Sequence, residues 1–204
     1  MMGFGKKKVM LTFDDGFKYA GEILEVLKKH RVKATFFVCG QWMEGHGEEY
    51  RDIFREKHEI GNHGYSHVRM EELSDEEALD EIDRVQRLSR ELVGVGARWF
   101  RFPYGRKDKR LCRLVRRRRM RTVGWTIDTK DWEGISGERI AGTVMENVTN
   151  GAVILMHTLG EHTAEALDMM IPELKKRGYK MITMSQLARD PVLYVRLRRQ
   201  KVIV

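Results

Sequence analysis

The sequence predicts a single α/β domain with a largely parallel sheet, either open or closed into a barrel. About seven short apolar runs typical of strands alternate with amphipathic helical patterns, and this alternation favours a parallel sheet with helices packed on it. The length of 204 residues suits one domain with a sizeable core and is short for two.

The predicted strands are short apolar segments, several of them rich in β-branched or aromatic residues. Because helical patterns separate them, we expect the strands to pair side by side within one sheet. They are Val9–Phe13, Ala34–Val38, Glu59–Asn62, Trp99–Arg101, Thr122–Ile127, Ala152–Met156 and Lys180–Thr183.

Helices are predicted between these strands. Ala20–His30, Lys109–Arg118 and Ala164–Arg177 have apolar residues that fall on one helical face. A further long helix is expected after Ser74, where the residues Ser-Asp-Glu-Glu form a capping box. Pro172 should kink or restart the last helix, because proline lacks the backbone N–H that a helix interior uses.

Composition indicates a folded protein, with 42% hydrophobic and 33% charged residues. Much of the net charge of +8 lies in Arg113–Arg121 and Arg196–Lys201. We expect these runs to be a solvated helix face and a basic tail, and the alternative is attraction to a polyanion or an anionic membrane surface. Nucleic acid is not an expected partner, because no aromatic residues interleave the runs.

No apolar run approaches the roughly 20 residues that span a bilayer, and the N-terminus does not resemble a signal peptide. As the sequence stands, we expect a cytoplasmic protein, or an extracellular or cell-surface one if a leading segment has been removed. Cys39 and Cys112 are too few for a disulfide framework. Cys39 is expected to be a buried free thiol, although a disulfide between the two stays open.

Polar and ionisable residues collect where the predicted strands end. In parallel α/β folds the active groups gather at the carboxyl ends of the strands, so this distribution predicts a functional site there. The residues are Asp14, Asp15, His63, Arg101, Asp128 and His157.

Taken one at a time, the motifs also have structural explanations. The spacing of His63 and His67 would put two imidazoles on one face of a helical turn, as a metal site needs, but such pairs are also common at surfaces. The Asp14–Asp15 pair could cap a helix, and Arg101–Gly105 could be a turn. The remaining histidines have no comparable partner and are expected at the surface: His30, His46, His58 and His162.

Together, five motifs are more specific. TFDDG, HGYSH, RFPYG, DTKDW and ILMH follow one another from residue 12 to residue 157. This set resembles the motifs of the polysaccharide deacetylase family, also called the NodB-homology domain or carbohydrate esterase family four. The resemblance covers about Lys8 to Leu187. It implies an irregular (β/α) barrel of about seven parallel strands, forming a single domain over 1–204 with its core at about 8–187 and a basic C-terminal tail.

The resemblance assigns roles to the paired carboxylates and the two histidines. The first aspartate, Asp14, is implied to be the catalytic base, and Asp15 is implied to bind a divalent metal together with His63 and His67. That metal is expected to be Zn²⁺, with Co²⁺ or another divalent ion possible. A cation on Asp15 would remove its repulsion against Asp14.

The other motifs supply the remaining catalytic groups by the same resemblance. Arg101 is implied to pair with the base and keep it ionised. The backbone N–H of Tyr104 is implied to stabilise the oxyanion, and His157 to be the general acid for the leaving amine. Asp131 is implied to hydrogen-bond to that histidine or to brace the arginine.

The resemblance implies a hydrolase of carbon–nitrogen bonds other than peptide bonds. We expect a metal-dependent deacetylase that removes N-acetyl groups from an amino-sugar polymer or oligomer of the peptidoglycan or chitin type. Trp132 and Leu155 are implied to line the pocket for the acetyl methyl group. Trp42, Trp132 and Tyr65 could stack on sugar rings, although core packing explains such aromatic residues equally well.

Three alternatives stay open. A related cytoplasmic enzyme could open small cyclic amides, as an allantoinase does. Two histidines and one carboxylate also bind Fe(II) in oxygenases, but that function leaves Asp14 and two of the motifs unexplained. A non-catalytic module that binds carbohydrate or a polyanion would be favoured if a predicted catalytic residue were missing, and all are present.

Overall fold

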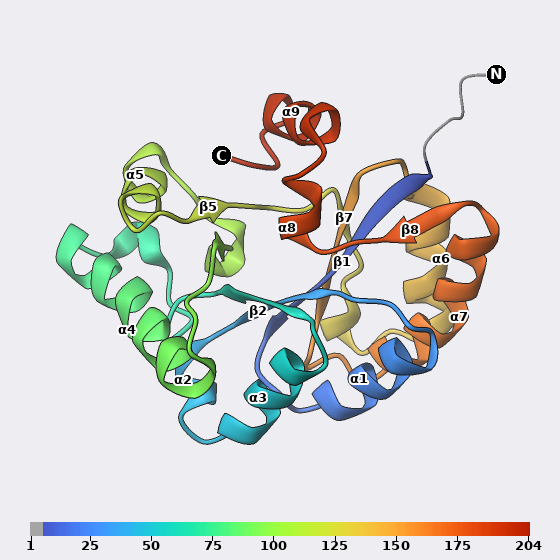
Figure 1. Ribbon diagram of the computed structural model, residues 1–204, viewed down its shortest axis with the longest axis horizontal. Coiled ribbons are helices and arrows are strands. Elements are labelled where there is room, and N and C mark those ends of the chain that lie inside the picture. The colour runs from blue at the N-terminus through green and yellow to red at the C-terminus, as the bar shows by residue number, and fades with distance from the viewer. Residues whose placement is uncertain (1–5) are drawn as a thin grey trace.

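A computed structural model describes residues 6–204 of the protein, which fold around one strongly curved sheet with helices packed around it (Figure 1). The described sheet has eight strands, and every pairing between them is parallel. They are β1 (Lys7–Asp15), β2 (Thr35–Val38), β3 (Glu59–Asn62), β4 (Trp99–Phe100), β5 (Arg121–Thr122), β6 (Ile127–Asp128), β7 (Ala152–His157) and β8 (Tyr179–Met181).

The strands follow the order β5-β4-β3-β2-β1-β7-β6, and β8 pairs with the start of β1. Within the described residues this path does not close between β5 and β6, so the sheet is a partly open barrel. β1 lies at its centre, and the register places Asp14 between Phe37 of β2 and His157 of β7. The predicted α/β fold with a parallel sheet curled into an irregular barrel is confirmed.

Helices occupy the connections between strands and bury their apolar faces against the sheet. Ser74 caps α4 as predicted, because its hydroxyl accepts the N–H of Glu77 while the Glu77 carboxylate accepts the N–H of Ser74. The described helices are α1 (Ala20–Lys29), α2 (Gly40–Met43), α3 (Gly47–Arg55), α4 (Asp75–Val93), α5 (Lys109–Arg117), α6 (Gly137–Asn147), α7 (Thr163–Lys176), α8 (Met184–Leu187) and α9 (Pro191–Arg199). None of them is long and apolar enough to cross a membrane.

Two predicted elements differ from the structure. The single strand predicted over Thr122–Ile127 is two short strands, β5 and β6, at opposite ends of the sheet order. The chain crosses the open side of the barrel between them, where Gly124 donates its N–H to the carbonyl of Val202. Of the two outcomes predicted at Pro172, a kink or a restart, the restart is wrong, because α7 continues as one helix through the proline.

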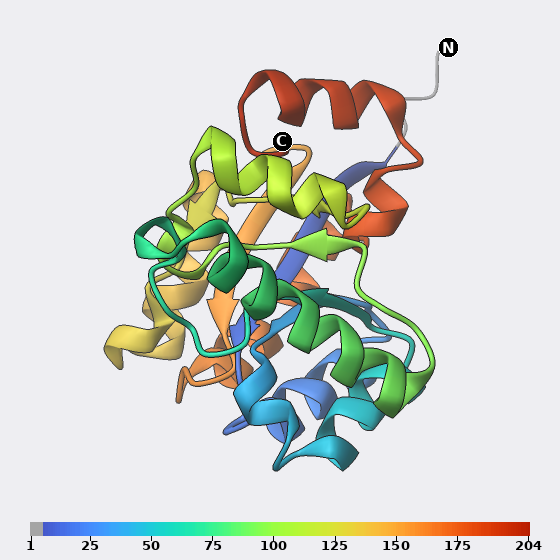
Figure 2. The same ribbon diagram turned by 90° about the vertical axis from the view of Figure 1, so that its left-hand side faces the viewer.

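The C-terminal segment is part of the fold and not a free tail. Figures 1 and 2 show α9 as the outermost element at one end of the molecule. Its side chains Leu193 and Leu197 are buried, and beyond the helix Ile203 forms an antiparallel bridge with Val123. The prediction of a basic tail after residue 187 is therefore corrected. These residues carry the predicted charge, but their apolar side chains also belong to a buried cluster with side chains of the sheet.

The predicted environment of Cys39 is confirmed, and that of His58 is wrong. Cys39 is a buried free thiol as predicted, and Cys112 is also free. His58 was predicted at the surface but is buried. Its Nδ1 accepts the N–H of Ala34, and its ring meets Phe36 edge-on. Burial lowers the pKa of His58 to about 4, so a neutral ring fills this position.

Replacing Leu197 tests whether the C-terminal helix contributes to the stability of the domain. Leu197→Ala should lower the free energy of unfolding by about 2–5 kcal/mol, because it leaves a cavity in a packed core. Urea denaturation measures this change. Val192→Ala on the exposed side of the same helix is the control and should change stability by less than about 0.5 kcal/mol. Equal effects would mean that α9 does not pack as described.

Candidate active site

A pocket of about 440 Å³ opens at the carboxyl ends of the central strands, where the sequence predicted a functional site. Most of the predicted site residues line it, and Arg101 and Asp131 lie buried behind residues that do. The lining residues are Asp14, Asp15, His63, His67, Phe102, Tyr104, Gly105, Trp125, Asp128, Trp132, Leu155 and His157.

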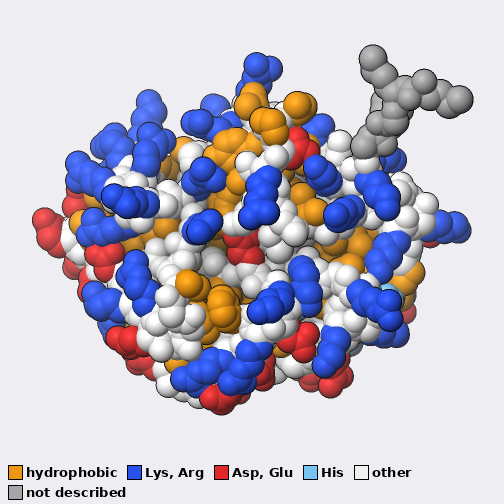
Figure 3. All heavy atoms as spheres, in the orientation of Figure 1, with side chains coloured by type: hydrophobic (Ala, Val, Ile, Leu, Met, Phe, Trp, Pro, Cys, Tyr) orange, Lys and Arg blue, Asp and Glu red, His pale blue; other side chains and the backbone are white. Residues whose placement is uncertain are grey.

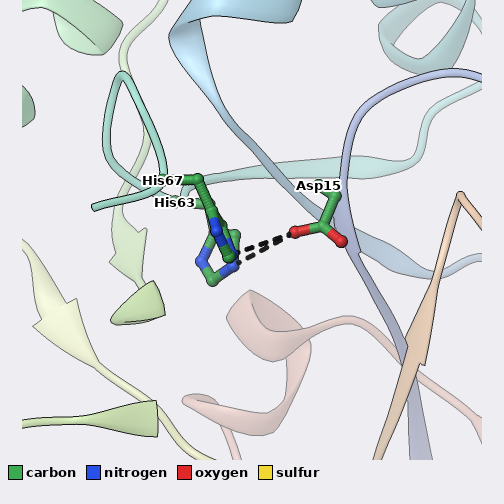
Figure 4. A group of neighbouring side chains, drawn as sticks. All are labelled: Asp15, His63 and His67. Carbon is green, nitrogen blue, oxygen red and sulfur yellow. Dashed lines mark ion pairs between the residues drawn. The ribbon is translucent and has the colours of Figure 1, made fainter. Parts of the chain in front are cut away.

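Asp15, His63 and His67 converge on one point of the pocket (Figure 4). Asp15 Oδ1 lies 3.6 Å from His63 Nε2 and 3.3 Å from His67 Nε2, and the three possible ligand atoms lie within 4.8 Å of one another. Asp15 Oδ1 is buried without a hydrogen-bond partner. An unpartnered buried carboxylate oxygen facing two imidazole nitrogens fits a divalent cation of the kind that nitrogen and oxygen ligands hold.

The protonation preferences of these groups also suit a cation. Burial and the neighbouring Asp14 raise the pKa of Asp15 to about 6, so its charge is costly without a positive partner. Burial lowers the pKa of His63 and of His67, which favours the neutral ring that can coordinate. His63 Nδ1 donates to the carbonyl of Arg101 at 2.7 Å, which leaves the Nε2 lone pair directed toward the carboxylates.

The two histidines meet through a loop and not through a helical turn. His67 has a left-handed backbone with φ of 55°, as Asp15 does with φ of 85°, which is uncommon for residues other than glycine. Glu81 of α4 holds this loop, because its Oε2 accepts the N–H groups of Tyr65 and Ser66, each at 2.8 Å. No sequence pattern predicted this role for Glu81.

Arg101 holds the first carboxylate of the pair. It is fully buried, and its Nη1 donates to Asp14 Oδ1 at 2.7 Å and to the hydroxyl of Thr12 at 2.9 Å. Its guanidinium carbon lies 4.3 Å from the ring centroid of Phe37. The arginine therefore neutralises Asp14 from behind, and the other carboxylate oxygen, Oδ2, lies 3.5 Å from His63 Nε2.

Asp131 holds His157 on the opposite side of the pocket. Its Oδ1 accepts from His157 Nδ1 at 2.7 Å, while its Oδ2 accepts the N–H of His157 and the hydroxyl of Thr163. Burial disfavours the imidazolium, but the hydrogen bond and charge of Asp131, together with the charges of Asp14 and Asp15, outweigh it and raise the pKa of His157 to about 9. At neutral pH this histidine therefore carries a proton that it can give to a group in the pocket.

The predicted substrate-binding residues form the rim and wall of the pocket. Trp132 and Tyr104 are 60% and 58% exposed at the rim, and Leu155 is buried in the wall. The other two candidates for stacking on sugar do not line the pocket. Trp42 packs beside Gly16, and the guanidinium carbon of Arg84 lies over the ring of Tyr65.

The sequence and the fold match known proteins. A family model described as polysaccharide deacetylase matches residues 2–123. The chain belongs to the polysaccharide deacetylase family. The peptidoglycan-N-acetylglucosamine deacetylase of Bacillus cereus is 36% identical over 187 residues, which cover 89% of this chain and 68% of that protein. The protein YlxY of Bacillus subtilis is 35% identical over 172 residues, which cover 84% of this chain and 54% of that protein.

Solved structures of this family superpose closely on the chain. Peptidoglycan deacetylase PdaC from Bacillus subtilis matches with a TM-score of 0.85 and 33% identity, covering 96% of this chain and 97% of that one. A CE4 family pseudoenzyme from Bacillus anthracis matches with a TM-score of 0.86 and 36% identity, covering 89% and 65%. A mutant of it with restored enzymatic activity also matches at 0.86. Because the fold is common to active and inactive members, the site residues must decide activity.

Some lining residues of this polysaccharide deacetylase family member were not assigned a role from the sequence. Trp125 lies under the loop at Gly105, where a Cβ would come within 2.5 Å of the tryptophan ring. The positive φ of 66° at the same glycine adds a second reason for its lack of a side chain. Asp128 was expected near the site and lines the pocket. The position of Asp128 at the end of a predicted strand indicated that it would lie near the site. Trp125 lies within a predicted strand, and no feature of the sequence indicated that it would line the pocket.

The pairing of His157 with Asp131 can be tested by titration. NMR of the labelled histidine ring should show His157 titrating near pH 9, and Asp131→Asn should lower that pKa by roughly 1–3 units because an opposite charge is lost. The pKa of His157 in the folded protein lies above 6.5, the ordinary value for histidine. The stability that the pair contributes is therefore fully present below pH 6.5. It is lost as pH rises through about 9.

Asp128→Asn is the control for this titration. Asp128 lines the same pocket, but it is not among the groups that change the pKa of His157. Its replacement should leave the titration in place. Titration of His157 near pH 6.5 in the unsubstituted protein would contradict the described contact.

Proposed function

We propose that the protein is a metal-dependent deacetylase that hydrolyses N-acetyl groups of an amino-sugar polymer of the peptidoglycan type. One observation carries this proposal: the convergence of Asp15, His63 and His67 beside the Asp14–Arg101 pair, with His157 across the same pocket. Each group has an environment that suits a separate step of amide hydrolysis. We also infer that the catalytic domain includes α9, because α9 packs into its core.

Asp15, His63 and His67 would hold the cation. Two imidazoles and one carboxylate are a common ligand set of catalytic zinc sites, which leave a position open for water and substrate. We therefore assign Zn²⁺, and Co²⁺ should replace it. When bound, the ion supplies Lewis acidity, which polarises the acetyl carbonyl and makes water easier to deprotonate.

Asp14 and His157 would move the protons. Asp14 would take a proton from the attacking water, and the hydrogen bond from Arg101 would hold its carboxylate in place at the pocket. The backbone N–H of Tyr104 would donate to the oxyanion. His157 would then protonate the leaving amine, and its raised pKa, which Asp131 sustains, suits a general acid at neutral pH.

The rim of the pocket supports a polymeric substrate. Trp132 and Tyr104 are exposed on the outside of the site, where an aromatic face can stack on a sugar ring that extends into solvent. Leu155 would contact the acetyl methyl group in the wall. The relatives named for a reaction are peptidoglycan deacetylases, so the alternative of a cyclic-amide hydrolase gains no support. A peptidoglycan substrate favours action outside the cytoplasm.

A substrate panel tests the proposal. The protein would be incubated with peptidoglycan fragments, chitooligosaccharides, acetylated xylan and allantoin, and acetate, free amine and ring-opened product would be measured. We expect acetate and free amine from the amino-sugar substrates, loss of turnover on exhaustive chelation, and recovery with Zn²⁺ or Co²⁺. Ring opening of allantoin without acetate release, or full activity in protein shown to be metal-free by elemental analysis, would overturn it.

Two histidine variants control for contaminating activity. His157→Ala should lower kcat by about 10²–10⁴-fold, as the loss of a general acid does. His162 lies five residues further along the chain and contacts Glu165 at the surface. His162→Ala should therefore retain the original rate.

A further inference from the structure

One surface of the molecule combines exposed valines with exposed cations. On α9, Val192 is 82% exposed and Val195 is 47% exposed. They point away from Leu193 and Leu197, which are buried against the domain. Val192, Val195 and Arg199 are spaced so that they share one face of the helix. Figure 3 shows hydrophobic side chains bordered by basic ones at the end where Figure 1 has α9.

The two basic runs of the sequence meet at this surface. Residues 191–204 hold four cationic side chains and no carboxylate side chain. Residues 109–127 hold eight cationic side chains and likewise no carboxylate side chain. The guanidinium carbon of Arg121 lies 5.4 Å from the ring centroid of Tyr194. Lys107 Nζ donates to the carbonyl of Lys201 at 2.9 Å. The exposed residues of α5 and α9 therefore form one continuous basic area, the α5/α9 surface.

We propose that the α5/α9 surface docks the protein on an anionic phospholipid bilayer, with Val192 and Val195 entering the interface. Cations alone would suit any polyanion, and a polyanion in water gives no reason for two valines on the exposed face. A bilayer interface takes up both kinds of side chain, because anionic headgroups attract the cations while the acyl boundary receives the apolar groups. This inference goes beyond the proposed function and does not depend on it.

Docking in this way would direct the pocket away from the membrane. Lys8 at the start of β1 pairs with Asp190 just before α9 at 2.6 Å, and Asp14 and Asp15 end the same strand. At about 3.3 Å per residue, β1 would hold the carboxylates roughly 25 Å from the docked surface. The catalytic groups would then face a polymer that lies above the membrane.

Vesicle binding tests this inference with the full chain. Sedimentation with vesicles of phosphatidylcholine and 30–40% phosphatidylglycerol (about the anionic content that attracts polybasic segments) should show binding that weakens with salt. Vesicles of phosphatidylcholine alone should bind far less. Arg198→Ala with Arg199→Ala should weaken binding by about 25-fold, since each cation near an anionic leaflet contributes about fivefold.

The valines distinguish a bilayer from a soluble polyanion. Val192→Ser with Val195→Ser should weaken vesicle binding by about tenfold, because less apolar surface leaves water. The same variant should bind long-chain polyphosphate as the original protein does, whereas the arginine variant should lose affinity for both probes. These side chains are exposed, so thermal unfolding and hydrolysis of a small soluble substrate should stay unchanged and show that each variant is folded.

Matched substitutions elsewhere control for general effects of charge and apolar area. Val95→Ser changes a valine that is 50% exposed in the loop after α4, away from α9. Arg87→Ala with Arg139→Ala removes two exposed cations, one from α4 and one from α6. Both should retain vesicle binding. The proposal is overturned if the protein does not prefer anionic vesicles, if the valine variant binds them as tightly as the original, or if this surface instead pairs two copies in sedimentation equilibrium.

Discussion

Two adjacent carboxylates at the end of the central strand are the constraint on which the site depends. Asp14 and Asp15 are both buried, and two like charges this close cannot both be ionised there without compensation. The fold provides a different partner for each. A buried arginine meets the first from behind, and two imidazoles face the second across a position where a cation would fit.

The parallel sheet makes this separation possible. Successive residues of a strand point to opposite faces, but Asp15 leaves the strand with a positive φ, so both carboxylates reach the same pocket. The register of β1 with β7 then brings His157 beside Asp14. The hydrogen bond from that histidine to Asp131, together with the nearby carboxylates Asp14 and Asp15, raises its pKa to about 9. Asp14, His157 and the three groups that could hold a metal therefore meet in one pocket, where the buried Oδ1 of Asp15 still lacks a hydrogen-bond partner.

Much of this arrangement could be predicted from the sequence, because strand ends and motif order are local properties. The five motifs identified the groups that meet in the pocket, and the capping box fixed the start of α4. The features that could not be predicted depend on contacts between residues that are far apart in the chain. Glu81 holds the histidine loop from another element, and His58 is buried by neighbours that its own surroundings in the chain do not reveal. The C-terminal run appears as a basic tail until Leu197 and Ile203 are seen inside the core.

Asp14 and Asp15 are adjacent and chemically identical, but we expect them to have different roles. Zinc titration by calorimetry, paired with steady-state kinetics on Asp14→Asn and Asp15→Asn, distinguishes these roles. Asp15→Asn should weaken zinc binding by more than the roughly 10–100-fold typical of losing an outer hydrogen-bond partner, and excess metal should restore part of the rate. Asp14→Asn should bind zinc with near-normal stoichiometry while kcat collapses and added metal gives no recovery. Loss of zinc by Asp14→Asn with retention by Asp15→Asn, or indistinguishable behaviour of the two variants, would show that the two carboxylates do not have these separate roles.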